Sequence, residues 1–268
     1  LPPPSFEEIL EMTMIHSVAG SLAGDFLLQR PFRSPHHTSS YVALVGGGAY
    51  PKPGEITLSH RGVLFLDEFS EFERRAIESL RQPLEDGIIN ISRAKDSLTF
   101  PARFIMICAM NPCPCGILGS KTKTCICSQG SLMRYQRKIS SPIIDRIDLW
   151  LEVPQIEHEK LSDARISGEF SGTIQKRVIK AREIQQKRFS AKGGQVLTNS
   201  EMGVRELKKF CLLSDNVTSI LNQAAKRLDL SSRAYHRVIK LGRTIADLEG
   251  AEDIRESHIL EALQYRPK

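Results

Sequence analysis

The most constraining feature of this sequence is a run of four apolar residues, Val63–Leu66, followed directly by two acids, Asp67 and Glu68. A short, wholly apolar run is typical of a strand buried on both faces in a parallel sheet. Open α/β sheets place functional groups at the carboxyl ends of such strands. Adjacent carboxylates there suit a Mg²⁺ shell and a base that polarises water. Taken alone, the pair fits an exposed acidic turn equally well.

Three polar residues further along favour the first interpretation. Asn111 follows a second apolar run, at 104–108, and we expect its amide to orient the same water molecule. Arg146 precedes an apolar stretch at 147–153 that we expect to form a strand, and a guanidinium there suits charge developing on phosphate. Arg233 opens a predicted helix, where its charge opposes the helix dipole and indicates a ligand.

The pattern predicts an α/β domain at residues 1–154, a polar connector at 155–172 and a smaller all-helical domain at 173–268. In the first domain we expect helices at 5–18 and from a capping box at Ser70 to Gln82, mostly loop over 30–53, and a hairpin over 88–100. In the second we expect helices at 173–190, 200–210, 215–228, 232–248 and 255–264.

Charge and hydropathy limit the kinds of partner that the sequence predicts. The net charge of +6 lies entirely in residues 155–268, because residues 1–154 contain equal numbers of acids and bases. This excess favours a polyanion such as nucleic acid, although a solvated surface explains it as simply. For the basic helix at 174–192 we favour the solvated interpretation. No run approaches a membrane span and no signal peptide is evident, so we expect a cytoplasmic protein without a membrane partner.

Four cysteines form a C-x-C-x9-C-x-C pattern, at Cys113, Cys115, Cys125 and Cys127. Four thiols in two close pairs suit a structural, tetrahedral Zn²⁺, and disulfides are disfavoured in the cytoplasm. The loop between them has too little apolar content to fold without such a link. Free or oxidised thiols are the alternative. Cys108 and Cys211 lie in apolar patterns and are expected in the core.

The stretch RPFRSPHHTSSYVALVGGGAYPKPGEITLSHRGVLFLDEFSEF, at residues 30–72, resembles the magnesium-chelatase-like AAA+ ATPases, in the branch that includes bacterial competence proteins. RQPLEDG, ISRA, NPCPCG, DRIDL and GRTIADLEG continue the resemblance over almost the whole chain. It implies a partial AAA+ P-loop core with hairpin insertions, followed by a helical lid domain, and a homo-oligomeric ring, expected to be a hexamer.

The resemblance also implies roles for single residues. Asp67 and Glu68 correspond to Walker B, with Asp67 holding Mg²⁺ through water and Glu68 activating the attacking water. Asn111 corresponds to sensor 1, Arg146 to an arginine finger acting on the ATP of a neighbouring subunit, and Arg233 to the sensor 2 arginine on the ATP phosphate.

One family feature is missing, because no G-x-x-x-x-G-K-[ST] phosphate-binding loop occurs anywhere in the sequence. We therefore expect this chain by itself to bind ATP poorly and to hydrolyse none. It begins at Leu1 without an initiator methionine, and we expect it to be a piece of a longer protein.

In this family, as in replicative helicases of the MCM type, a hairpin between Walker B and sensor 1 projects into the channel of the ring. The predicted hairpin would present Arg93 and Lys95 to a DNA backbone; an ordinary surface hairpin is the alternative. A second insertion, at 39–58, contains three glycines that permit close backbone approach or flexibility. His36 and His37 are expected to be structural rather than metal ligands.

The leading hypothesis is an ATP-driven ring motor that unwinds or branch-migrates DNA during natural transformation. The alternative is an ATP-dependent remodeller of a protein partner, like the chelatase I subunit. A third interpretation, a non-catalytic oligomerisation module, follows from the missing phosphate loop. Cationic groups at the hairpin tip discriminate between them, because a motor on DNA needs such groups and a remodeller does not.

Overall fold

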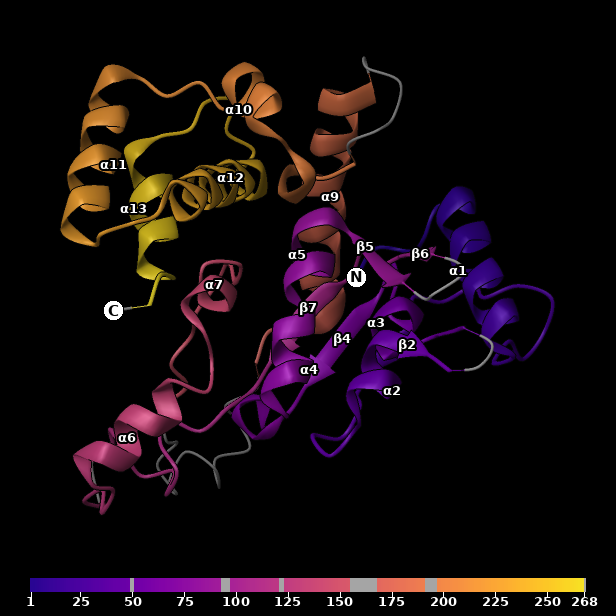
Figure 1. Ribbon diagram of the computed structural model, residues 1–268. Coiled ribbons are helices and arrows are strands. Elements are labelled where there is room, and N and C mark those ends of the chain that lie inside the picture. Colours follow the sequence, from indigo (N-terminus) through magenta and orange to yellow (C-terminus); the bar gives the residue numbers. More distant parts are fainter. Residues whose placement is uncertain (49–50, 93–96, 121–122, 155–167, 191–196, 268) are drawn as a thin grey trace. The chain divides into compact units, whose positions relative to one another are not determined.

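The computed structural model describes residues 1–48, 51–92, 97–120, 123–154, 168–190 and 197–267. It contains two compact units, Pro3–Arg146 and Ile147–Lys268, the latter together with Leu1–Pro2 (Figure 1). The first unit has a parallel sheet with hairpins and the second is helical, which confirms the predicted fold class. Within the described ranges, no helix is long and apolar enough to cross a membrane.

The N-terminal unit contains short elements joined by long loops. In chain order they are α1 Phe6–Ala19, β1 Phe32–Arg33, α2 Tyr41–Val45, β2 Gly46–Gly47, β3 Lys52–Pro53, α3 Glu55–Leu58, β4 Val63–Leu66, η1 Phe69–Glu71, α4 Arg74–Ser79, α5 Arg81–Asp86, β5 Ile88–Ser92, β6 Ser97–Pro101, β7 Ile105–Cys108, α6 Gln129–Gln136 and α7 Ser141–Ile144.

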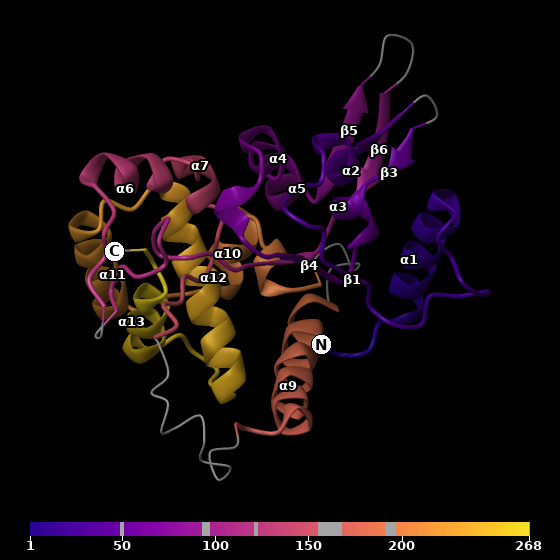
Figure 2. The same cartoon turned by 90° about the horizontal axis from the view of Figure 1, so that it is seen from below.

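A three-stranded parallel sheet, in the order β1-β4-β7, organises this unit. The strands β4 and β7 are labelled in Figure 1, and β1 and β4 in Figure 2. The central strand β4 is the predicted buried strand, and Leu64 and Leu66 are almost fully buried. Gly62 allows β1 to approach it, because a Cβ at this position would lie 1.9 Å from the Pro31 carbonyl oxygen. The register pairs Leu66 with Cys108, so the carboxyl ends of β4 and β7 lie side by side.

The strand β7 forms as predicted, but it is not buried on both faces. Ile105 and Ile107 are more than two-fifths exposed, whereas Met106 and Cys108 are half-buried. An apolar run indicates a strand without stating which face is covered, and in the described part of the chain one face of β7 is open.

The first capping box is confirmed, and the second is wrong. Ser5 caps α1, its hydroxyl accepting from the Glu8 N–H while the Glu8 carboxylate accepts from the Ser5 N–H. Ser70 lies inside the short helix η1 instead of capping the following helix. Its hydroxyl is buried and donates to the Tyr135 hydroxyl at 2.8 Å. The predicted helix over 70–82 is divided accordingly into η1, α4 and α5.

The segment predicted to be mostly loop, 30–53, contains more structure than expected. The strand β1, one short helix, α2, and a small hairpin, β2–β3, lie within it, and the helix α3 follows directly. Gly46 has a φ of 101°, and a Cβ there would meet the Lys52 carbonyl oxygen at 2.4 Å. Close backbone approach, which the three glycines permit, is therefore borne out at Gly46. The glycines form a turn between regular elements. A glycine-rich composition alone predicts a loop at such a place.

The second hairpin is confirmed as β5 paired antiparallel with β6, from Ile88 opposite Pro101 to Ser92 opposite Ser97 (Figure 2). A Cβ at Gly46 would lie 3.2 Å from the Ile91 side chain, so the two hairpins contact each other. The residues of the tip, Arg93 and Lys95 among them, lie outside the described residues.

The third predicted strand, at 147–153, is wrong, since this segment is extended but pairs with no strand in the described chain. It contacts the end of the last helix instead. The Trp150 N–H donates to the Tyr265 carbonyl oxygen at 2.8 Å, and Arg266 donates to the Ile147 carbonyl oxygen at 2.9 Å. Leu151 remains 70% exposed. The apolar stretch predicted a strand, but it could not supply the pairing edge that a strand requires.

The helices of the C-terminal unit agree closely with the prediction. They are α9 Ser171–Ser190, η2 Asn199–Glu201, α10 Val204–Phe210, α11 Asp215–Arg227, α12 Ser232–Glu249 and α13 Glu256–Gln264. Their apolar faces share one core, in which Leu221, Val238 and Ile259 are almost fully buried. Cys211 belongs to this core, as predicted, and burial raises the pKa of its thiol to about 11.

Candidate functional site

The predicted acids and Asn111 emerge from neighbouring strand ends. Beyond the strands, the Ala109 N–H donates to the Leu66 carbonyl oxygen at 3.0 Å, and the Phe69 N–H donates to the Ala109 carbonyl oxygen at 2.9 Å. These bonds hold the segment with Asp67 and Glu68 against the segment that leads to Asn111. All three polar side chains are exposed, as groups that meet a ligand must be.

A tight backbone turn presents the acids. Glu68 adopts the left-handed conformation, with φ 51° and ψ 43°, which is uncommon for a residue other than glycine. The Glu68 N–H donates to the Asp67 carboxylate at 2.8 Å. Such conformations persist where the surrounding structure enforces them, and they are frequent at functional sites.

Glu68 has a partner that the sequence did not indicate. The His37 Nδ1 atom lies 2.7 Å from the Glu68 Oε2 atom. The His37 ring lies tilted against that of His36, with 4.2 Å between the ring centroids, and it packs edge-to-face with Phe72. His37 follows β1, which runs parallel to β4, so both residues leave the same edge of the sheet. The carboxyl ends of parallel strands share one edge, but no pattern in the sequence indicated β1, because residues 30–53 were expected to be mostly loop.

Arg146 is held within its own unit. Only 10% of its side chain is exposed, its guanidinium pairs with Glu85, and it donates to the Pro142 carbonyl oxygen at 2.6 Å. Its Nε atom is buried without a hydrogen-bond partner among the described residues. An arginine acting on a neighbouring subunit would have to leave Glu85.

The other predicted cations lie elsewhere. Arg233 is exposed in the first turn of α12, in the C-terminal unit, and Ser231 caps that helix. The solvated interpretation of the basic helix α9 is wrong for Arg188. Its side chain is 14% exposed and donates to Asp247, which is fully buried, and to Asn199. A count of basic residues could not identify a buried acid 59 residues away.

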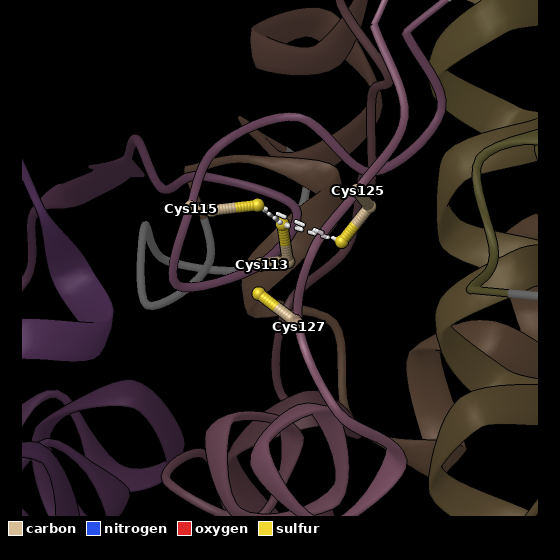
Figure 3. A group of neighbouring side chains, drawn as sticks. All are labelled: Cys113, Cys115, Cys125 and Cys127. Atoms are coloured by element: carbon tan, nitrogen blue, oxygen red, sulfur yellow. Dashed lines mark hydrogen bonds between the residues drawn. The ribbon is translucent and has the colours of Figure 1, made fainter.

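The four cysteines of the C-x-C pairs converge on one point (Figure 3). The Sγ atom of Cys113 lies 3.4 Å from that of Cys115 and 3.8 Å from that of Cys125, and the last two are 3.6 Å apart. With Cys127, all four Sγ atoms lie within 4.8 Å of one another. Four thiolates around Zn²⁺, each at about 2.3 Å, would be about 3.8 Å apart. The cluster therefore fits a tetrahedral metal ion.

Backbone N–H groups donate hydrogen bonds to sulfur atoms of this cluster. The Leu118 N–H donates to the Cys113 Sγ atom at 3.3 Å. A hydrogen bond from the Ile117 backbone lowers the pKa of the Cys115 thiol to about 6, whereas burial raises the pKa of Cys127 to about 12. A metal ligand must be a thiolate, so the first proton leaves readily and the metal's own charge must displace the rest. The isolated Cys108 differs from Cys115 in this respect, because burial raises the pKa of its thiol to about 12.

The family profile described as magnesium chelatase, subunit ChlI, matches residues 1–161, and that of the subunit ChlI C-terminal region matches residues 168–266. The chain belongs to the magnesium chelatase ChlI family of AAA+ ATPases. This confirms the resemblance drawn from the sequence motifs. The first profile covers the acidic edge of the sheet, which is the strand end that carries Asp67 and Glu68, and the second covers most of the helical unit.

Curated relatives narrow the branch of the ChlI family. Competence protein ComM of Haemophilus influenzae is 47% identical over 239 residues, which cover 89% of this chain and 45% of ComM. Protein YifB of Salmonella typhimurium is 45% identical over 267 residues, covering 99% of this chain and 51% of YifB. More distantly, DNA replication licensing factor mcm-6 of Caenorhabditis briggsae is 24% identical over 232 residues, 80% of this chain and 26% of that protein. The chain spans about half the length of ComM and YifB.

Proposed function

We propose that this chain is the Walker B to lid portion of an ATP-driven ring motor that acts on DNA. The observation that carries the proposal is the pairing of two strand ends, which brings Asp67 and Glu68 beside the segment of Asn111. In the proposal, Asp67 holds Mg²⁺ through water, Glu68 activates the attacking water and Asn111 orients it. Arg233 contacts the ATP phosphates, and Arg146 contacts the ATP of the neighbouring subunit.

The residues present fit one half of an ATP and Mg²⁺ site. Exposed carboxylates at a sheet edge are suitable ligands for the water shell of Mg²⁺. The sequence contains no phosphate-binding loop, so the amides and lysine that cradle the phosphates must come from outside these residues. The expected activity of this chain alone is therefore negligible, and the proposal concerns the full-length protein.

DNA as the substrate is supported by the relatives and by the hairpin. The name of ComM refers to competence and that of mcm-6 to DNA replication. The β5–β6 hairpin leads to Arg93 and Lys95, two cations that suit contact with a phosphate backbone without sequence preference. We propose unwinding or branch migration of DNA during natural transformation, by a homo-oligomeric ring expected to be a hexamer.

An ATPase assay and a branched-DNA unwinding assay on the full-length protein test this function. Changing Arg93 and Lys95 together to alanine should leave basal ATP turnover intact and weaken DNA binding at least about tenfold. A matched control changes Lys208 and Lys209, an exposed basic pair on α10, to alanine. Unimpaired DNA binding and unwinding by the Arg93/Lys95 variant would contradict the hairpin assignment. ATP turnover without any DNA activity in the wild type would favour the remodeller of a protein partner.

We also propose that the four-cysteine cluster holds a structural Zn²⁺, on the strength of its sulfur separations. Elemental analysis of purified protein should find about one zinc per chain. Changing Cys125 to serine should remove most of it, whereas the same change at Cys211, outside the cluster, should not. Zinc far below stoichiometry in the wild-type protein would refute the metal and favour free thiols.

A further inference from the structure

The hydroxyl of Tyr135 joins the two segments that carry the acidic edge. It donates to the Asn111 carbonyl oxygen at 2.9 Å and accepts from the Ser70 hydroxyl at 2.8 Å. Tyr135 is 5% exposed and Ser70 is 2% exposed, so water does not compete for these bonds. A buried hydroxyl that satisfies two partners fixes their separation more firmly than an exposed one does.

The two partners of Tyr135 belong to different strand ends. Ser70 lies two residues beyond Glu68, after β4, and Asn111 lies three residues beyond the end of β7. Lys138 adds a second link on the same side, because its Nζ atom lies 3.0 Å from the Glu71 carboxylate. The helix α6 with its following turn thus holds the segment after β4 against the segment after β7.

The cysteine cluster lies directly before the start of α6 in the sequence. Cys113 follows Asn111 by two residues, and Cys127 is followed by Ser128, which caps α6 by accepting from the Ser131 N–H. A single centre therefore closes the loop that leads from Asn111 to the helix of Tyr135. The loop also passes close to the Asn111 side chain, since a Cβ added at Gly116 would lie 3.9 Å from the Asn111 side-chain oxygen.

We propose that Tyr135 is a positioning residue that sets Asn111 relative to Glu68, and that the four-cysteine centre acts through it by fixing α6. The proposal rests on the proposed function for its effect on ATP hydrolysis, but its structural part does not. Displacing a group that orients a reacting water by about 1 Å can cost about a hundredfold in rate. Loss of the Tyr135 hydroxyl should therefore lower the turnover number while leaving nucleotide affinity nearly unchanged.

The test compares Tyr135→Phe with Tyr265→Phe in the full-length protein. The control also loses one tyrosine hydroxyl, but that group lies 3.4 Å from Glu261 in the helical unit and far along the chain from the acidic edge. Tyr135→Phe should lower ATP turnover by about tenfold or more, with nucleotide affinity within about twofold and zinc content unchanged. Tyr265→Phe should resemble the wild type. Unchanged turnover in Tyr135→Phe would overturn the proposal.

A second readout needs no turnover. Hydrogen–deuterium exchange should rise in the peptides that contain residues 68–72 and 109–113 when Tyr135 is changed to Phe, and in the same peptides when the metal is removed with a chelator. Ser70→Ala, which keeps the Tyr135 ring, should raise exchange in the first peptide, and the double variant should add little to Tyr135→Phe alone.

The turnover and exchange experiments distinguish a failure of the proposed function from a failure of the role of Tyr135. If the wild-type protein hydrolyses no ATP, the proposed function fails, and the exchange data alone decide whether Tyr135 joins the two segments. If exchange in both peptides is unchanged by Tyr135→Phe, the link does not constrain Asn111, and the inference is wrong whatever the activity. If Tyr135→Phe raises exchange but chelation does not, the role of the cysteine centre is wrong.

Discussion

The His37 Nδ1 atom lies 2.7 Å from the Glu68 Oε2 atom, on a carboxylate that is otherwise 55% exposed. An exposed glutamate samples several rotamers, and this contact selects one of them. We predict that His37→Ala lowers ATP turnover of the full-length protein by about tenfold, a fraction of the effect of losing a general base itself. Steady-state turnover at saturating ATP measures it.

The neighbouring histidine provides the matched control for that prediction. The His36 ring packs against that of His37, but its Nδ1 atom bonds to the Thr38 hydroxyl instead of an acid. His36→Ala should therefore retain most of the turnover. Equal losses in both variants would mean that the histidine pair matters only for packing, and no loss in His37→Ala would remove this residue from the site.

A buried ionic cluster should dominate the stability of the C-terminal unit. The side chain of Asp247 is fully buried and accepts hydrogen bonds from Arg188, Arg243 and Asn199. Asp247→Asn leaves two arginines without their carboxylate, and we predict a loss of about 3–5 kcal/mol in the free energy of unfolding. Chemical denaturation measures it. Asp253→Asn, at an exposed position in the same unit, should change stability by less than about 0.5 kcal/mol, and a similarly small loss at Asp247 would contradict the prediction.

Stability should fall in mild acid because of His60. This side chain is buried, its Nδ1 atom accepts from the Arg103 N–H, and burial lowers its pKa from 6.5 to about 4. Between these two pH values the unfolded chain binds a proton that the folded chain does not, so the free energy of unfolding decreases as pH falls through this window. The full effect is about 3 kcal/mol.

Denaturation series between pH 7 and pH 4.5 check that prediction. Glu8 and Glu11 also have lowered pKa values, through their bonds to Arg30 and Arg61, but stability from such carboxylates is lost mainly below pH 4.5. Burial also lowers the pKa of His16, so a His60→Gln variant should lose a large part, but not all, of the pH dependence above 4.5. A slope equal to that of the wild type would show that other groups carry it.

Sequence patterns correctly predicted those elements that depend on interactions between residues near one another in the chain. The strand Val63–Leu66, the capping box of Ser5 and the helices of the C-terminal unit all follow from neighbouring residues. The convergence of the C-x-C pairs, at Cys113 and Cys125 for example, also followed from spacing, because each pair brings two ligands to one place.

Contacts between distant residues could not be predicted in this way. Ser70 was assigned to a helix cap, yet its partner Tyr135 lies 65 residues away in sequence. The stretch at 147–153 is as apolar as a strand, but a strand also needs an edge to pair with. The contact of His37 with Glu68 follows from the sheet topology, because His37 comes after a strand that is parallel to β4. The residues next to His37 in the sequence did not indicate this contact.

The most direct test of the account is the ATP turnover of Glu68→Gln in the full-length protein, measured together with its nucleotide affinity. Glu73→Gln, at an exposed position five residues further along, is the matched control. A glutamine keeps the size of the side chain but cannot accept the proton of the attacking water, so turnover should fall by at least about a hundredfold with little change in affinity. Turnover close to that of Glu73→Gln would contradict the assignment of these acids as the catalytic edge.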